Sequence, residues 1–335
     1  MRSAAARSRP SETQWIEVRS EAEQLDFGQA VRDGLAGPTK TLPSQFFYDD
    51  EGSRLFEEIC SLPEYYLTRA ETEILDRHAD ELASRLPNVK AIVELGSGSA
   101  LKTEFLLRAF GDRIDDLCYA PIDVSRLALE ESVDRLEQDH PELLIRPAIA
   151  EYEAGLAELA RLSLGPTLTL WLGSSIGNLD RTDAAAFLGQ VSRTMRPADR
   201  LLVGIDLRKA RNVLEAAYND SAGVTARFDL NLLARINAEL GGQFDLDRFE
   251  HVAHYDETSG SVQSFLASRD AQSVVIRDIG VEVEFEAGER IHTENSHKYS
   301  LEEIDALAEE AGLRLEHRYF DADRRFTLNL FALPA

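Results

Sequence analysis

The sequence predicts an α/β fold in which a parallel sheet is interrupted by a second, α+β domain. Between residues 89 and 206, five short apolar runs alternate with helical patterns, and this alternation is typical of βαβ units around a buried parallel sheet. After Asp206 the alternation stops for roughly eighty to ninety residues, which is far longer than an ordinary loop. A chain of 335 residues is long enough for both parts.

The strands of the predicted parallel sheet are short, apolar and rich in β-branched residues, as strands buried on both faces are. They are expected at residues 91–95, 117–122, 143–149, 168–172 and 201–205. Parallel strands need crossover connections, and the helical patterns between these runs supply them. The crossover helices are expected at residues 102–110, 126–137, 153–162 and 183–195.

The remaining elements lie on either side of this sheet. Residues 44–86 are predicted to be helical, with a helix from near Ser53 that ends at Pro63 and a second helix for which Thr68 is a candidate N-cap. Further along, the predicted elements are helices over most of 208–237, antiparallel strands at 262–268 and 274–285, a helix at 301–311 that ends at Gly312, and strands at 314–320 and 326–333. The carboxyl ends of the parallel strands should border a cleft.

Composition argues against several classes of function. Lys and Arg total 36 against 60 Asp and Glu, and the net charge of -24 would repel nucleic acid or an anionic membrane. Two cysteines, Cys60 and Cys118, supply neither a disulfide scaffold nor a structural zinc site. His251 and His254 resemble a metal pair but lack the H-E-x-x-H order and a third ligand, so no metal is expected. A small-molecule substrate and a cytoplasmic location are the expectation.

A glycine-bearing turn follows the first predicted parallel strand. Gly96 and Gly98 let the backbone bend sharply and bring its amides close to a ligand. A dinucleotide-binding turn would carry a third glycine where this sequence has Leu101. Glu94, two places before the first glycine, is instead typical of S-adenosylmethionine-dependent methyltransferases, in which the acid orients the loop and the cationic end of the ligand.

Polar residues also follow three other predicted strands. Asp123 ends the second strand and could accept both hydroxyls of a ribose, although a helix-capping role fits it too. Glu151 and Tyr152 follow the third strand, where an adenine would be contacted. Asn178 follows the fourth strand and could donate to a carboxylate, but asparagine before a helix is also a common turn residue.

Near the end of the interrupting part, Glu294 and Ser296 lie two residues apart in an extended segment and would face the same side. A carboxylate and a hydroxyl on one face could hold an imidazole or another ring with an N–H group. The pattern alone favours a solvated edge strand.

Taken together, five segments resemble one enzyme family, the L-histidine Nα-methyltransferases that begin ergothioneine biosynthesis. The segments occur in family order, and the resemblance runs from about Phe47 to the C-terminus. They are residues 62–69 (LPEYYLTR), 94–98 (ELGSG), 173–178 (GSSIGN), 218–225 (YNDSAGVT) and 294–299 (ENSHKY). The resemblance implies a Rossmann-like class I methyltransferase core at 69–208 and 299–335, and a second, inserted α+β domain at 20–68 and 209–298. The first 19 residues would form a loose tail.

The resemblance also implies roles for individual residues. The S-adenosylmethionine site would comprise Glu94, Gly96, Gly98, Lys102, Asp123, Glu151 and Tyr152. The amino-acid end of the substrate would be held by Tyr66, Asn178 and Tyr218, and the imidazole by Glu294 and Ser296. Asn295 and Ser264 would also belong to the substrate-binding residues. Tyr48 and Tyr66 are the candidate catalytic residues, as hydroxyls that could relay the proton of the amine. Ser264 stands where the family can carry methionine, so the volume of the substrate pocket could differ.

The expected reaction is three successive methyl transfers to the α-amine of L-histidine, by a monomer. Within the same chemistry, Glu294 could also accept an indole N–H, so tryptophan, or more generally another aromatic amino acid such as tyrosine, is the alternative substrate. A nucleotide-dependent oxidoreductase would use the same sheet, but Leu101 in place of the third glycine counts against it. A protein that only senses S-adenosylmethionine would have no use for a substrate pocket.

Overall fold

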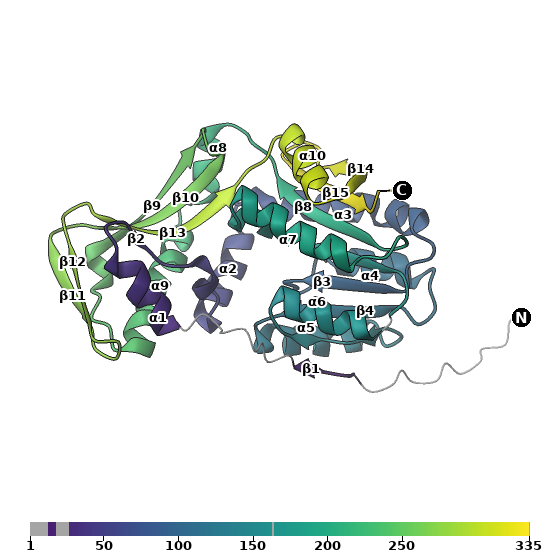
Figure 1. The fold of residues 1–335 in the computed structure, drawn as a ribbon, viewed down its shortest axis with the longest axis horizontal. Coiled ribbons are helices and arrows are strands. Elements are labelled where there is room, and N and C mark those ends of the chain that lie inside the picture. Colours follow the sequence, from purple (N-terminus) through teal and green to yellow (C-terminus); the bar gives the residue numbers. More distant parts are fainter. Residues whose placement is uncertain (1–12, 18–26, 163, 335) are drawn as a thin grey trace, which may run out of the picture.

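The computed structural model describes residues 13–17, 27–162 and 164–334. Its largest element is a sheet with strand order β1-β6-β4-β3-β7-β8-β15-β14, in which β5 also pairs with β4 (Figure 1). The strands are parallel up to β8, and the last two, β15 and β14, are antiparallel. Their bounds are β1 Ile16–Glu17, β3 Ala91–Leu95, β4 Cys118–Asp123, β5 Leu144–Ile145, β6 Ala148–Ile149, β7 Thr167–Trp171, β8 Arg200–Asp206, β14 Arg314–Phe320 and β15 Phe326–Ala332. The predicted α/β fold is confirmed.

Helices cover both faces of this sheet. Neighbouring strand residues point to opposite faces, so that Ile92 joins one hydrophobic cluster and Val93 the other. The first cluster takes in α3 (Tyr66–Arg85), α4 (Glu104–Gly111) and α5 (Arg126–Asp139), and the second takes in α6 (Tyr152–Arg161), α7 (Arg181–Thr194) and α10 (Leu301–Glu310). This burial on both faces explains why the strands are apolar throughout.

Two local features differ from expectation. The single strand predicted at 143–149 is divided into β5 and β6, with Pro147, which lacks an N–H donor, in the gap between them. Ile16–Glu17 pairs in parallel with Ala148 and Ile149 at the edge of the sheet, although this segment was expected to be part of a loose tail. The rest of that predicted tail, residues 1–12 and 18–19, lies outside the described residues.

The second lobe contains a smaller sheet in the order β2-β13-β10-β9 and a separate β11–β12 hairpin. Its strands are β2 Lys40–Thr41, β9 Phe249–Asp256, β10 Ser261–Ser268, β11 Gln272–Ile276, β12 Val281–Phe285 and β13 Arg290–His297. Its helices are α1 Phe27–Ala36, α2 Asp50–Cys60, α8 Arg211–Ala217 and α9 Val224–Leu240, and its short 3-10 turns are η1 Ser44–Phe47 and η3 Leu246–Arg248. A third 3-10 turn, η2 Ser175–Asn178, connects β7 of the large sheet with α7. Helix α9 packs on β9, β10 and α2. In Figure 1 this lobe lies beside the large sheet.

Strand β13 is not the solvated edge strand that its sequence pattern favoured. It pairs with β10 along its length and with β2 near its start, and η2 packs against it. The chain leaves the large sheet at Leu207 and returns at Tyr299, and these two residues form a parallel bridge. Because the two connections lie side by side, β13 ends next to the carboxyl end of β8.

Helix α3 begins at Tyr66, so Thr68 lies within its first turn and does not cap it. Within the described residues, no helix combines the length and the apolar character needed to cross a membrane. The same part of the chain contains no group of three His, Cys, Asp or Glu side chains that could hold a metal ion.

Candidate active site

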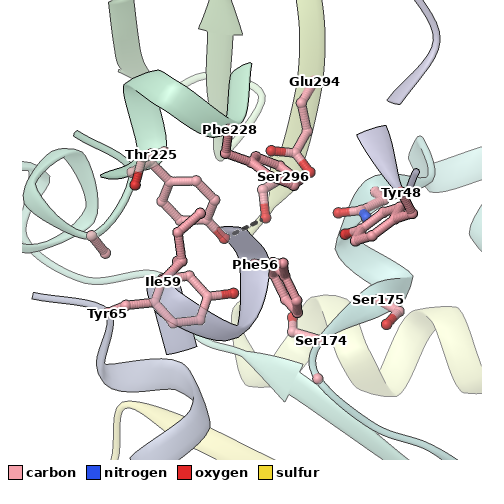
Figure 2. Close-up of a pocket in the computed structure, with 14 residues that line it drawn as sticks. Tyr48, Phe56, Ile59, Tyr65, Ser174, Ser175, Thr225, Phe228, Glu294 and Ser296 are labelled. Carbon is pink, nitrogen blue, oxygen red and sulfur yellow. Dashed lines mark hydrogen bonds between the residues drawn. The ribbon is translucent and has the colours of Figure 1, made fainter. Parts of the chain in front are cut away.

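Two adjoining hollows lie at the carboxyl ends of the parallel strands. The wide one, here called the outer cleft, is bordered by the turns after β3, β4, β6 and β7 and by residues of η1, α2 and β13. The smaller one, here called the inner cavity, is lined by Tyr48, Phe56, Ile59, Tyr65, Gly173, Ser174, Ser175, Asn178, Ala217, Tyr218, Thr225, Phe228, Glu294 and Ser296 (Figure 2). Both hollows share Tyr48, Phe56, Tyr65, Gly173, Ser175, Asn178 and Glu294. A ligand in the inner cavity would therefore touch one in the outer cleft.

The glycine-bearing turn forms one wall of the outer cleft. Gly96 has φ +70°, and a Cβ there would lie 2.6 Å from the Tyr152 hydroxyl. Glu94 is buried beneath the turn, where it accepts hydrogen bonds from the hydroxyls of Thr103 (2.6 Å) and Tyr119. Burial raises the pKa of Glu94 to about 7. Glu94 therefore ties Thr103, after the turn, to β3, and it also lines the outer cleft.

Asp123, at the end of β4, lies next to two backbone amides and forms no ion pair with the described residues. Its carboxylate accepts from the N–H groups of Gly98 (3.0 Å) and Ser125 (2.9 Å). Burial raises the pKa of Asp123, although these N–H groups partly offset the rise. Each carboxylate oxygen has a second lone pair, so two hydroxyls of a sugar could still be accepted.

Apolar side chains border the same part of the cleft. Leu101, Val124 and Leu127 are 52%, 60% and 48% exposed, respectively, and all three line the cleft. Exposed apolar side chains beside a glycine turn and a carboxylate suit a ligand with a flat apolar base and a sugar. The residues present therefore fit an adenosyl group. Glu151 and Tyr152 complete this wall, with Glu151 exposed at the N-terminus of α6.

Lys102 lines the cleft but is already paired within the protein. Its ammonium donates to Glu71, a fully buried residue of α3. The Glu71 carboxylate also accepts from the N–H of Gly173, at 2.9 and 3.0 Å. Through Glu71, the segment after β3 that carries Lys102 is joined to the turn after β7 that carries Gly173. These contacts connect the walls of the two hollows.

Glu294 brings a carboxylate to the inner cavity without a hydrogen-bond partner among the described residues. Burial, together with Asp229, raises the pKa of Glu294 to about 7, while Lys298 and His251 partly counter the rise. His251 pairs with Asp229 at 2.6 Å and donates to the backbone carbonyl of Tyr218. An unpaired carboxylate in a largely buried cavity is costly unless a ligand with an N–H group supplies a partner.

Ser296 lies on the same face of β13 and points into the same cavity (Figure 2). Its hydroxyl lies 2.7 Å from that of Tyr218, and both accept hydrogen bonds from Lys298. Burial raises the pKa of Tyr218, so its phenol stays protonated at neutral pH. Glu294, Ser296 and Tyr218 are thus brought together as the sequence motifs implied, from β13 and from the end of α8.

Tyr66, in contrast, does not line either hollow, and this expectation needs correction. Its hydroxyl donates to Asp206 (2.6 Å) and accepts from Lys209 (2.6 Å) in the protein interior. Tyr65 lines the inner cavity instead, and its hydroxyl makes no hydrogen bond to the described residues. Adjacent residues at a helix start point about 100° apart, so the helix boundary decides which of the two tyrosines faces the cavity. The sequence shows two neighbouring tyrosines and gives no sign of this choice.

The opposite wall of the inner cavity is aromatic. The ring of Tyr48 lies 5.7 Å from that of Phe56 and 5.9 Å from that of Phe228, and Phe56 lies 6.3 Å from Tyr65. Asn178, in η2, lines both hollows and makes no side-chain hydrogen bond to the described residues. Phe56 and Phe228 were missed because, in sequence, they belong to apolar helix stripes that are indistinguishable from core residues.

The other predicted residues lie outside the inner cavity. Ser264 is the cross-strand neighbour of Glu294 but is buried and lines neither hollow. Asn295 accepts from His292 (3.0 Å), if that ring nitrogen carries the proton, and borders the outer cleft. His254 is three residues after His251 on one strand, and its side chain is half exposed whereas that of His251 is buried.

Comparisons with known proteins point to one enzyme family. The family described as histidine-specific, S-adenosylmethionine-dependent methyltransferase matches residues 27–333. A histidine N-alpha-methyltransferase of Mycolicibacterium smegmatis is 39% identical over 94% of this chain and 97% of the relative. Ergothioneine biosynthesis protein 1 of Schizosaccharomyces pombe is 32% identical over 83% of this chain and 37% of the relative. An L-tryptophan methyltransferase of Psilocybe serbica is 27% identical over 89% of this chain and 90% of the relative.

Proposed function

Because the chain belongs to the family of histidine-specific, S-adenosylmethionine-dependent methyltransferases, we propose that it trimethylates the α-amine of L-histidine. The product is histidine betaine, and the reaction is the first step of ergothioneine biosynthesis. The observation that carries the proposal is that Glu294, whose carboxylate has no hydrogen-bond partner among the described residues, and Ser296 face the same cavity from one strand, and that this cavity opens on the outer cleft.

The outer cleft is proposed to hold S-adenosylmethionine, which supplies an electrophilic methyl group when bound. Asp123 would accept the two ribose hydroxyls, and Leu101, Val124 and Leu127 would cover the adenine. The backbone at Gly96 can approach the ligand closely because no side chain stands there. Glu94 would act through its hydrogen bond to Thr103, after the turn, and Lys102 through its pairing with Glu71. Glu151 and Tyr152 would contact the base.

The inner cavity is proposed to hold the amino acid. Glu294 and Ser296 would hydrogen-bond the imidazole, with the hydroxyl of Tyr218 bonded to that of Ser296 beside them. Asn178 would hold the α-carboxylate, because its amide can donate. The amine would then face the shared boundary of the two hollows, where Tyr48 and Tyr65 lie. Holding the amine within about 3 Å of the methyl carbon and in line with the breaking bond would supply most of the rate enhancement.

The amine must lose a proton before it can attack the methyl group. The α-amine of a free amino acid is more basic than the N-terminal amine of a chain, so only a small fraction is unprotonated at neutral pH. The Tyr48 and Tyr65 hydroxyls could pass the proton toward the open cleft. Their rings, with those of Phe56 and Phe228, also form an aromatic wall against which a permanently charged trimethylammonium group would be stabilised.

The domain division, oligomeric state and location are proposed on related grounds. The methyltransferase core would be residues 69–208 and 299–335, because the chain leaves and re-enters the large sheet at the paired residues Leu207 and Tyr299. A monomer would suffice, since one chain supplies all the residues that line the inner cavity. A cytoplasmic location fits the intracellular supply of both substrates. Light scattering on the purified protein would test the monomer.

The test of function is mass spectrometry of the purified protein with S-adenosylmethionine and an equimolar mixture of the twenty amino acids. Histidine alone should gain three methyl groups. Methylation of tryptophan or tyrosine instead would preserve the chemistry but replace the substrate, and the absence of any methylated amino acid would refute the proposal. Stabilisation by S-adenosylhomocysteine but not by NAD, measured as the melting temperature, would exclude an oxidoreductase.

A further inference from the structure

Lys298 lies directly beneath the inner cavity and is completely buried. It follows the last residue of β13, and its ammonium donates to the hydroxyls of Tyr218 (2.7 Å) and Ser296 (2.9 Å). The same nitrogen lies 3.2 Å from a carboxylate oxygen of Asp206. An ammonium has three N–H donors and no acceptor, so these three neighbours use its full hydrogen-bonding capacity.

Asp206 supplies the charge that makes this burial possible. It lies at the end of β8, is completely buried, and also accepts from Tyr66 (2.6 Å) and Lys209 (2.7 Å). A buried ammonium without a counter-charge would lose its proton or unfold its surroundings. Because Asp206 belongs to the large sheet and Ser296 to the small one, Lys298 links the core strand to the cavity wall of the second lobe.

The contact with Lys298 determines whether the hydroxyls of Tyr218 and Ser296 can donate a hydrogen bond to a ligand or accept one from it. Each must accept from the ammonium, and they lie 2.7 Å from each other, so one of their two protons occupies the bond between them. The remaining proton has no place within the pair. If Tyr218 donates to Ser296, the Ser296 oxygen accepts from both Tyr218 and Lys298, and the Ser296 O–H points to the cavity. If Ser296 donates to Tyr218, the Tyr218 oxygen accepts from both Ser296 and Lys298, and the Tyr218 O–H points to the cavity. The pair therefore presents a hydrogen-bond donor.

Glu294, two residues before Ser296, presents the opposite polarity. Its ionised carboxylate can only accept hydrogen bonds. A ring that fits between the two groups needs one N–H for Glu294 and one nitrogen lone pair for the hydroxyl. A neutral imidazole has both, whereas a pyrrole or an indole has an N–H alone.

On these grounds we propose that Lys298 is a positioning residue that fixes the Tyr218–Ser296 pair as a hydrogen-bond donor, and that the cavity thereby selects a ring with one N–H and one unprotonated nitrogen. The inference rests on the proposed function, since it concerns how that site distinguishes histidine from rings that have only an N–H. A ring without the lone pair leaves a buried O–H unsatisfied, and we expect about a 10- to 100-fold loss in kcat/KM.

The first experiment uses the unmodified protein. It compares kcat/KM for L-histidine with that for 3-(pyrrol-2-yl)alanine and 3-(pyrrol-3-yl)alanine, in which one or the other ring nitrogen is replaced by C–H. Both analogues should be turned over at least about tenfold less efficiently than histidine. Turnover of either analogue within about threefold of histidine would overturn the inference. Failure to trimethylate histidine at all would instead refute the proposed function, and the inference with it.

The second experiment tests Lys298 itself. Lys298→Met removes the ammonium that holds the hydroxyl lone pairs, so the outward O–H is free to turn away from the cavity toward Asp206. The ratio of histidine to pyrrole turnover should then fall to within about threefold of one. Lys209→Met is the matched control, because it removes another ammonium from Asp206 without touching the hydroxyl pair. That variant should keep the ratio of the unmodified protein. An unchanged ratio in Lys298→Met, or the same fall in both variants, would contradict a positioning role. If Lys298→Met does not fold, the analogue ratios of the unmodified protein decide the matter.

The pH dependence of kcat/KM for histidine tests whether the charge of Lys298 acts on Glu294. The charged groups that face Glu294 are Asp229, His251 and Lys298, and the hydroxyls of Tyr48, Tyr65 and Tyr218 surround it as well. Lys298 is a cation that favours the ionised carboxylate, so its removal should move the acid limb of kcat/KM for histidine to higher pH. Lys209→Met, whose ammonium is not among the charges that act on Glu294, should leave that limb in place. An unshifted limb in a folded, cofactor-binding Lys298→Met protein would count against the inference.

Discussion

Glu294→Gln is the substitution for which the structure gives the most specific expectation. It keeps the size of the side chain and removes only its ability to ionise. In the native protein the carboxylate lies in the inner cavity without a hydrogen-bond partner among the described residues, and burial raises its pKa from 4.5 to about 7. A raised carboxyl pKa means that the folded state disfavours the ionised form. The substitution should therefore stabilise the protein while it damages function.

The stabilisation that Glu294→Gln brings should increase with pH. Below about pH 4 the carboxyl is protonated in both the folded and the unfolded protein, and it contributes no penalty. As the pH rises through 4.5 the unfolded chain ionises first, so stability is lost until the folded group ionises near pH 7. The penalty that glutamine removes is about 1 kcal/mol at pH 5.5 and about 3 kcal/mol above pH 8.

The assay is urea denaturation of both proteins, without ligand, at pH 5.5 and pH 8.5. The variant should gain about 2 kcal/mol more in unfolding free energy at the higher pH than at the lower. Glu284→Gln, on the exposed face of β12, is the matched control and should show no such difference. A stability difference between the Glu294 variant and the native protein that does not change with pH would refute the reasoning.

The same variant should lose histidine turnover. An amide oxygen accepts a hydrogen bond more weakly than a carboxylate, and the difference of about 1–2 kcal/mol corresponds to a fall of about 5- to 30-fold in kcat/KM. Glu294→Ala, which removes the acceptor altogether, should cripple turnover. Titration calorimetry with S-adenosylhomocysteine should give an unchanged affinity for both variants. Loss of that affinity would show that Glu294 does not act on the substrate ring.

Four further substitutions test the two hollows separately. Asp123→Asn should weaken S-adenosylhomocysteine binding about tenfold, since a neutral amide is a poorer acceptor for two hydroxyls; calorimetry that shows native affinity would remove Asp123 from the cofactor site. Tyr65→Phe should lower kcat for histidine with little change in melting temperature. Tyr66→Phe should instead lower the unfolding free energy by about 1–2 kcal/mol, because buried Asp206 loses a hydrogen bond. A loss of kcat in Tyr66→Phe and a loss of stability in Tyr65→Phe would restore Tyr66 to the site. Gly96→Ala should weaken cofactor binding and lower the melting temperature, because its Cβ would lie 2.6 Å from the hydroxyl of Tyr152 and its φ is +70°; a melting temperature equal to that of the native protein would show that the turn adapts.

The parallel sheet could be predicted closely from sequence because its signals are local. Strand β3 begins and ends where the apolar run does, at Ala91 and Leu95, and the crossover helices differ from expectation by only a few residues at their ends. Strands buried on both faces must be apolar throughout, and their connections must be helical, so the pattern follows from burial alone. The acidic residue and the glycines of the first turn could be placed for the same reason.

The second lobe was harder to predict because its strands are covered unevenly. In strand β9 only Phe249 and Tyr255 are buried as whole residues, so it lacks a regular alternation, and the sequence analysis did not identify it. The sequence pattern of β13 is that of an exposed edge strand, but in the structure β10 pairs with it and η2 packs against it. Those contacts join segments far apart in the chain, and no local pattern records them.

The sequence by itself determined the fold class, the glycine-bearing turn and the placement of Glu294 and Ser296 on one face of a strand, because each follows from local spacing along the chain. Only the tertiary structure decided that Tyr65 and not Tyr66 faces the substrate cavity, since that choice depends on where helix α3 begins. It also decided that Lys298 holds the hydroxyls of Ser296 and Tyr218 against Asp206. A hydrogen bond between residues on different elements depends on how the two sheets are packed, and that packing is set by the whole chain.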